Sequence, residues 1–88
     1  MFCYVYILQS LKDKLFYIGF TSNLNRRLNE HRSGRNKSTS RRLPLKLIFF
    51  EAYLNKHDAL RRESYFKTNK GKVTLRQMLK EYLRSNDQ

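Results

Sequence analysis

Two short tyrosine-containing segments near the N-terminus carry side chains that could take part in a reaction. Tyr4–Tyr6 (YVY) and Tyr17–Gly19 (YIG) lie in runs rich in aromatic and β-branched residues, which predicts two strands. Residues 10–14 between them are polar and have the length of a hairpin connection. Antiparallel pairing would bring Tyr6 and Tyr17 to one face of a sheet, where two phenols either pack in the core or act on a substrate.

The segment that follows the second strand adds a cation and a titratable ring. Residues 24–32 (LNRRLNEHR) predict a helix with an apolar stripe, and Ser22 or Thr21 is the expected N-cap. Arg27 and His31 are one turn apart on the side of that stripe. On this pattern alone, the simpler interpretation is that both border the core, with the arginine stem lying over it.

A second predicted helix places a carboxylate on an otherwise apolar face. Residues 56–68, capped by Asn55, bring Glu63 onto the same face as the apolar side chains, whereas Arg62 is assigned to the outer side. A carboxylate on an inward face is costly unless a cation or a hydrogen-bond donor meets it. Arg27 is the structural candidate for that partner, and a metal ion is the functional one.

The charge balance indicates a polyanionic partner. Nineteen Lys and Arg residues against 7 Asp and Glu give a net charge of +12. Nucleic acid is the first candidate, although an anionic membrane surface or a ribosomal neighbourhood fits the same charge. Residues 33–42 (SGRNKSTSRR) contain no apolar side chain, so we expect an exposed loop that contacts phosphates or is simply solvated.

The remaining segments complete an α+β plan. Residues 45–53 (LKLIFFEAY) predict a third strand, expected to be the most buried, and Asn69–Lys72 predicts a break with Gly71 at a helix end. A last helix is expected over residues 75–85, capped by Thr74, with Met78 facing inward. The prediction is a three-stranded antiparallel sheet flanked by three helices in a single domain, 1–88.

Composition excludes several classes of protein. No run of about 18 apolar residues could span a membrane, and no charged leader precedes an apolar stretch, so we expect a cytoplasmic protein. The single cysteine, Cys3, cannot form an internal disulfide, and no Cys/His cluster has the spacing of a zinc site.

These residues together resemble the signature of the GIY-YIG nuclease superfamily. The first triplet reads YVY in place of GIY, and the second reads YIG. The arginine after the second triplet, the histidine one turn later and the downstream helical glutamate fall at Arg27, His31 and Glu63. The resemblance covers nearly the whole chain and is to the small single-domain bacterial type, similar to the nuclease domain of the excision-repair incision subunit.

The resemblance implies a metal-dependent endonuclease that hydrolyses phosphodiester bonds in structured or damaged DNA. It makes Glu63 the single protein ligand of Mg²⁺ (or Mn²⁺) and Tyr6 the base for the attacking water. Tyr17 would position water or a phosphate oxygen, Arg27 would brace the phosphate, and His31 would relay a proton. The basic side chains expected to contact DNA are Arg35, Lys37, Arg41, Arg42, Lys67, Lys70 and Lys72.

Some positions depart from the family pattern and leave a second function open. Phe20 stands where the excision-repair members have a lysine directly after the second triplet. Several relatives carry a catalytic asparagine beyond the glutamate, for which Asn69 is the candidate here, and Lys67 is placed to replace a lost positive charge. The alternative is a non-catalytic nucleic-acid-binding module on the same fold. Neither alternative involves a membrane or a small-molecule substrate, and both are compatible with a partner protein that supplies specificity.

Overall fold

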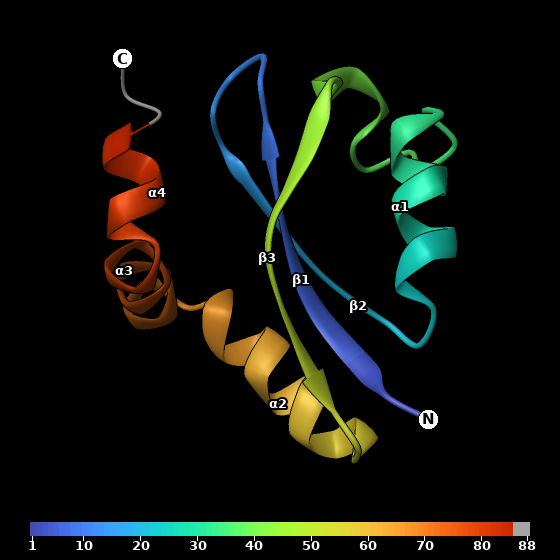
Figure 1. Ribbon diagram of the computed structural model, residues 1–88, viewed down its shortest axis with the longest axis vertical. Helices are drawn as coiled ribbons and strands as arrows, with labels where there is room; N and C mark the ends of the chain where they lie inside the picture. Colours follow the sequence, from blue (N-terminus) through green and yellow to red (C-terminus); the bar gives the residue numbers. More distant parts are fainter. Residues whose placement is uncertain (86–88) are drawn as a thin grey trace.

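The computed structural model describes residues 1–85 and confirms the α+β plan (Figure 1). A central sheet separates a single helix from three consecutive helices. The elements in chain order are β1 (Cys3–Ser10), β2 (Phe16–Thr21), α1 (Leu24–Arg32), the 3₁₀ turn η1 (Ser40–Arg42), β3 (Leu45–Tyr53), α2 (Lys56–Phe66), α3 (Asn69–Met78) and α4 (Lys80–Ser85).

The sheet has three antiparallel strands in the order β2-β1-β3, so β1 is the central strand. Residues 5–10 of β1 are all buried, because β1 has a neighbouring strand on each side and helices over both faces. The expectation that 45–53 would be the most buried strand is wrong, because β3 is an edge strand and none of its residues is fully buried. Its apolar composition misled the prediction, since an edge strand of a small sheet still covers part of each core.

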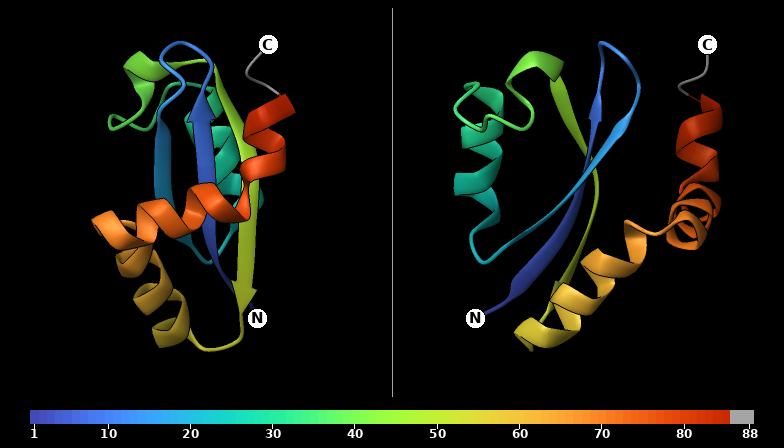
Figure 2. Two further views of the ribbon diagram at one scale, coloured as in Figure 1. Left: turned by 90° about the vertical axis from the view of Figure 1, so that its left-hand side faces the viewer. Right: turned by 180° about the vertical axis from the view of Figure 1, so that it is seen from behind.

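Alternation along β1 divides the core into two clusters, one on each face of the sheet. Figure 2 shows the helices that cover these two faces. Val5 and Ile7 face α2 and α3, where they pack with Phe66 and other apolar side chains. Tyr6 and Leu8 point to the other face and pack against α1. Side chains of successive strand residues point to opposite faces, so Tyr6, the last residue of the first triplet, lies on the α1 side.

Helix α1 spans the predicted residues, but its N-cap is neither of the two predicted caps. Asn23 is the N-cap, and its side-chain oxygen accepts the backbone N–H of Arg26 at 3.1 Å. Thr21, one of the two predicted caps, instead ends β2 and accepts the N–H of Asn23 at 3.1 Å. The turn from strand to helix is therefore held by two side chains in succession.

The C-terminal helical region differs from the prediction. The segment expected to break the chain is the first part of α3, whose N-cap is Thr68. Gly71 lies inside this helix and is buried, and a β-carbon there would come within 1.8 Å of the carbonyl oxygen of Tyr65. Thr74, the predicted cap, instead hydrogen-bonds the Tyr65 hydroxyl at 2.6 Å, and Met78 is 42% exposed. The glycine is thus required by close packing of α3 on the end of α2, and α4 completes what was predicted as one helix.

Candidate active site

Tyr6 and Tyr17 lie side by side on the α1 face of the sheet, as the strand pattern predicts. Their ring centroids are 6.3 Å apart, and Tyr6 is fully buried. In the register of β1 and β2, Tyr6 pairs with Gly19 of the second triplet. A β-carbon on Gly19 would come within 2.3 Å of Cζ of Tyr6, so the Tyr6 ring can lie over this point of β2 only because the residue is glycine.

His31 of α1 joins this pair through a buried chain of hydrogen bonds. The Tyr6 hydroxyl lies 2.9 Å from Nε2 of His31, and the Oγ1 of Thr39 lies 2.7 Å from Nδ1. The His31 ring also packs edge-on against Tyr17, with centroids 5.1 Å apart. His31 is therefore a member of the cluster, and two proton arrangements along the chain fit these distances.

Thr39 is a component of the site that the sequence does not reveal. It lies in the loop 33–42, which was expected to be exposed, yet Thr39 is fully buried. Its neighbours in sequence are polar, and neither helical nor strand periodicity reaches it. Only the closure of the loop onto α1 brings its hydroxyl to His31, so no local pattern could have identified it.

Burial favours the neutral forms of Tyr6 and His31, the two titratable groups in this chain of hydrogen bonds, and both are neutral near pH 7. Burial is the main cause that raises the pKa of Tyr6 to about 12; the neighbouring Tyr17 raises it further, and the guanidinium of Arg27 opposes the shift. Burial also lowers the pKa of His31 from 6.5, and Arg27 adds to this effect while Glu30 opposes it. The cluster therefore presents a neutral phenol and a neutral imidazole.

The lowered pKa of His31 predicts an acid-sensitive fold. In the unfolded chain His31 takes up a proton near pH 6.5, whereas in the folded chain it does so only at lower pH. Its stabilising contribution is thus complete above pH 6.5 and is lost as the pH falls through the folded pKa. We expect the melting temperature to fall more steeply between pH 7.5 and 5 in the wild type than in His31→Asn.

His57, which is exposed at the start of α2, provides the matched control for this measurement. The variant His57→Asn shows what the loss of an exposed imidazole does to the melting curves. An equal slope in wild type and His31→Asn would show that His31 does not titrate differently in the two states.

Arg27 of α1 lies next to the tyrosine cluster and lines a hollow at the surface. Its Nε pairs with Oε1 of Glu30 at 3.1 Å, one turn along the helix. The expected structural pairing of Arg27 with Glu63 is wrong, because Glu63 lies on the helix that covers the other face of the sheet. A hollow of about 490 Å³ lies between α1 and the basic loop (residues 33–42). It is lined by Arg27 and Glu30 of α1 and by Arg35, Asn36 and Lys37 of the loop.

Glu63 stands apart from this cluster. Its Oε2 pairs with Nζ of Lys67 at 3.2 Å, and its side chain is 19% exposed. Within residues 1–85, no hydrogen bond or ion pair joins Glu63 to Tyr6 or Arg27, and no group of three or more His, Cys, Asp and Glu side chains could hold a metal ion. The half-buried position on α2 agrees with the predicted inward face, and the cation that compensates the carboxylate is Lys67.

The pattern of two tyrosine triplets, an arginine and a glutamate corresponds to a known family. The family model described as the GIY-YIG catalytic domain matches residues 2–77 of the chain. The chain belongs to the GIY-YIG family. Its family membership gives it a nuclease-type domain, and the four residues Tyr6, Tyr17, Arg27 and His31 lie together within the matched region.

Relatives of this GIY-YIG protein are similar to most of its length. A UPF0213 protein of Streptococcus agalactiae is 42% identical over 74 residues, which cover 81% of this chain and 83% of that protein. A UPF0213 protein of Clostridium perfringens is 46% identical over 65 residues, covering 73% and 69%. The solution structure of a UPF0213 protein from Bacillus halodurans superposes with a TM-score of 0.56 at 36% identity, covering 89% of this chain and 85% of the other. In residues 1–85, no helix is both long and apolar enough to cross a membrane.

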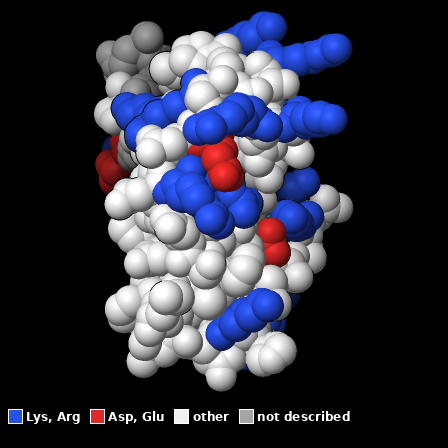
Figure 3. Space-filling view, turned by 90° about the vertical axis from the view of Figure 1, so that its right-hand side faces the viewer, with Lys and Arg blue, Asp and Glu red and all other residues white. Residues whose placement is uncertain are grey.

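The basic loop of the GIY-YIG chain presents its cations unequally. Arg35, Lys37 and Arg41 are exposed, and Figure 3 shows that Lys and Arg side chains gather on the side of the molecule where α1 and this loop lie. Arg42 is instead tied to the hairpin, with Nε 3.5 Å from Oδ2 of Asp13 and a hydrogen bond to the carbonyl of Phe16 at 3.3 Å. Arg42 therefore fixes the loop against the sheet.

The basic residues predicted beyond the glutamate lie elsewhere. Lys70 and Lys72 are exposed on α3, which is part of the layer on the opposite face of the sheet from α1. Lys67 at the end of α2 forms the ion pair with Glu63. These three lysines are therefore carried by the α2–α3 side, and the loop cations by the α1 side.

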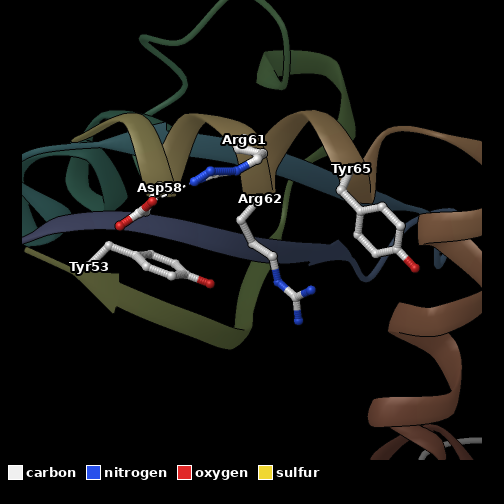
Figure 4. A pocket seen from close by; sticks show the side chains of 5 residues that line it. All are labelled: Tyr53, Asp58, Arg61, Arg62 and Tyr65. Atoms are coloured by element: carbon white, nitrogen blue, oxygen red, sulfur yellow. Dashed lines mark hydrogen bonds and ion pairs between the residues drawn. The ribbon is translucent and has the colours of Figure 1, made fainter. Parts of the chain in front are cut away.

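A second hollow, of about 460 Å³, lies beside α2 and contains Arg62 (Figure 4). The assignment of Arg62 to the outer side is wrong, because its guanidinium lies 4.3 Å from the ring centroid of the buried Phe66. It also donates to both carboxylate oxygens of Glu51, at 2.9 and 3.2 Å. The charge in this hollow is already compensated, so Arg62 joins β3 to α2 and is not free to bind a phosphate.

Proposed function

We propose that this GIY-YIG protein is an endonuclease that hydrolyses phosphodiester bonds in DNA, with structured or damaged DNA as its substrate. The observation that carries the proposal is the buried hydrogen bond between Tyr6 and His31, flanked by Tyr17 and Arg27 at the basic side of the molecule. A core that only needed volume would use apolar rings here, because a buried hydroxyl and imidazole must each find a partner.

The side chains of the cluster match what phosphodiester hydrolysis requires. An attacking water must lose a proton, and negative charge on the phosphate must be stabilised. Tyr6 is the proposed base, Tyr17 positions the water or a phosphate oxygen, and Arg27 neutralises the phosphate. The pKa of Tyr6, raised to about 12, means that a base function needs cations near the phenol when substrate is bound, and Arg27 is the one already present.

Glu63 is the proposed ligand of Mg²⁺ or Mn²⁺. Magnesium keeps several water ligands and commonly takes only one or two protein carboxylates, so a single glutamate fits this ion. In residues 1–85, Oε2 of Glu63 is paired with Lys67 while Oε1 has no hydrogen-bond partner, which leaves one oxygen open to a cation. A divalent ion bound there would supply positive charge beside α2 and would make its bound water more acidic.

The DNA-contacting surface is proposed to run from Arg27 over the basic loop. Arg35, Lys37 and Arg41 would contact phosphates, while Arg42 keeps the loop in place. Lys67, Lys70 and Lys72 would add contacts from the α2–α3 side if the DNA passes the edge at β2. The proposed location is the cytoplasm, and a partner protein would add the selectivity that so small a surface lacks.

Cleavage of supercoiled plasmid and of a branched oligonucleotide tests the proposal. We expect cutting by the wild type in Mg²⁺, no cutting in EDTA, and no cutting by Glu63→Ala. The matched control is Glu81→Ala, which removes an exposed carboxylate from α4 and should cut normally. Cleavage by Glu63→Ala at the rate of the wild type would remove Glu63 from the reaction.

The second candidate function is a non-catalytic nucleic-acid-binding module. It is favoured by the ion pair of Glu63 with Lys67 and by the position of α2 on the opposite face from Tyr6. Tight, salt-sensitive binding of both DNA substrates without cutting in Mg²⁺ or Mn²⁺ would support this function over the nuclease.

The basic loop is expected to supply a measurable share of the DNA affinity. Replacing Arg35, Lys37 and Arg41 together by Ala should weaken binding and make the slope of log K against log salt concentration less negative by about 3, because each lost phosphate contact accounts for about 0.9. The control removes three exposed cations from α2 and α4, as Lys56→Ala, Lys80→Ala and Arg84→Ala. Equal slopes for the two triple variants would show that charge alone, without the loop, accounts for binding.

A further inference from the structure

We propose that Thr39 is a positioning residue that holds His31 with its ring proton on Nε2, so that His31 donates a hydrogen bond to the Tyr6 oxygen. The placement of the proton follows from the contacts of Thr39, and its effect on cleavage rests on the proposed function. His31 is then a donor that stabilises ionised Tyr6, and not the group that takes the proton from it.

The Thr39 hydroxyl is fixed in place by its own backbone. Its N–H donates to the carbonyl of Asn36 at 3.2 Å, and its carbonyl accepts the N–H of Arg42 at 2.9 Å, so a turn closes on each side of the residue. Thr39 is fully buried, and its Oγ1 lies 2.7 Å from Nδ1 of His31. A buried hydroxyl on a fixed backbone presents its hydrogen bond from one direction.

A count of donors decides the direction of this hydrogen bond. A threonine hydroxyl has one proton to donate, and within residues 1–85 Nδ1 of His31 is the only side-chain or backbone atom that hydrogen-bonds it. If Nδ1 carried a proton and donated it to Thr39, the hydroxyl proton would remain buried without an acceptor. Leaving a buried donor unsatisfied is costly. The hydroxyl therefore donates, and Nδ1 is the acceptor.

The position of the second ring proton follows from the first. Burial lowers the pKa of His31, so the folded ring is neutral near pH 7 and carries a single proton. With Nδ1 accepting from Thr39, that proton is on Nε2, which lies 2.9 Å from the Tyr6 hydroxyl. The ring thus donates to the Tyr6 oxygen, and the Tyr6 hydroxyl directs its own proton toward Tyr17, whose side-chain hydrogen bond is one of the causes that raise the pKa of Tyr6.

This arrangement changes how Tyr6 can work. A hydrogen bond donated to the phenolic oxygen favours the phenolate, and so does the charge of Arg27, whereas burial disfavours it. In the proposed reaction the Tyr6 proton passes to the hydroxyl of half-buried Tyr17, which releases its own proton to solvent, and the phenolate then takes one proton from the attacking water. His31 keeps its proton throughout, since Nδ1 is occupied by the Thr39 hydroxyl.

Nitrogen-15 NMR of the intact protein tests the position of the ring proton. The chain has 2 histidines, buried His31 and exposed His57. At pH 7.5 we expect the correlation pattern of the Nε2–H tautomer for His31 in the wild type and in Thr39→Ser, which keeps the hydroxyl. In Thr39→Val, which has the same shape without the hydroxyl, this preference should decrease.

The cleavage assay gives the second readout. Thr39→Val should lower kcat about tenfold, the equivalent of one pKa unit on Tyr6, with KM unchanged, and Thr39→Ser should restore it. A proton on Nδ1 in the wild type, or an unchanged tautomer in Thr39→Val, would overturn the proposal. Because the NMR measurement needs no substrate, it decides the role of Thr39 even if the protein cuts no DNA.

Discussion

Tyr6→Phe is expected to lower kcat for DNA cleavage by about 10²- to 10⁴-fold, the usual effect of removing a general base. The change deletes one oxygen, which lies 2.9 Å from Nε2 of His31 and is the only group of the ring that can accept a proton. The ring itself still fills the fully buried space over Gly19, so the sheet should keep its packing. KM should change little, because in residues 1–85 no hydrogen bond joins the phenol to Arg35, Lys37 or Arg41, the loop cations proposed to contact phosphates.

The control for this variant is Tyr4→Phe. Tyr4 is on the same strand and the same face as Tyr6, but its ring packs against Phe50 and Phe2, and no hydrogen bond of its hydroxyl occurs in residues 1–85. We expect it to cut normally. The variant Tyr6→Phe leaves His31 without its partner, so melting curves of both variants must show that the assays use folded protein. A kcat for Tyr6→Phe within about threefold of the wild type would show that the phenol is not the base.

The same assignment predicts how the rate depends on pH. With a pKa of about 12, the phenolate fraction of Tyr6 rises about tenfold for each pH unit between 7 and 9. The logarithm of kcat should rise with it in the wild type and in Tyr4→Phe. Any rise that remains in Tyr6→Phe must come from another titrating group.

The tyrosine pair could be predicted from the sequence because its geometry is local. Strand alternation fixes which side chains share a face, and the short hairpin fixes which residues lie opposite each other, so Tyr6 and Tyr17 had to meet if both segments were strands. Arg27 and His31 followed from helical spacing on the element that comes next. Each of these inferences spans a single element or a single turn.

The parts that could not be predicted depend on contacts between distant segments. Thr39 reaches His31 only because the loop folds back on α1, and Arg62 turns inward to a half-buried position where Glu51 of the edge strand meets it. A pattern within either segment carries no information about the other. The same reason explains Glu63, whose face was predicted but whose partner, Lys67, was not.

The two faces of the sheet, one covered by three helices and the other by a single helix, differ in the kind of side chains that they bury. The face of α2 and α3 holds most of the apolar core, including Phe66 and Leu75, while the face of α1 holds the polar chain of Tyr6, His31 and Thr39. Most of the apolar packing and the Tyr6–His31–Thr39 chain therefore depend on separate sets of contacts. A variant of the first face should lower the free energy of unfolding without changing the tautomer of His31.

Gly71→Ala is the variant expected to show this most strongly. The added β-carbon would lie 1.8 Å from the carbonyl oxygen of Tyr65 and 2.9 Å from Cα of Phe66. Both are backbone atoms of α2, so no side-chain rotation can relieve the clash, and α3 would have to move with its buried Leu75. We expect a loss of about 3 kcal/mol or more in the free energy of unfolding, at the upper end for overpacked cores.

Urea unfolding measures this loss, and Lys70→Ala and Lys72→Ala are the matched controls because they change the exposed neighbours of the glycine on the same helix. Surface substitutions of this kind should stay within about 0.5 kcal/mol of the wild type. A result in that range for Gly71→Ala would mean that α3 does not pack so closely on α2.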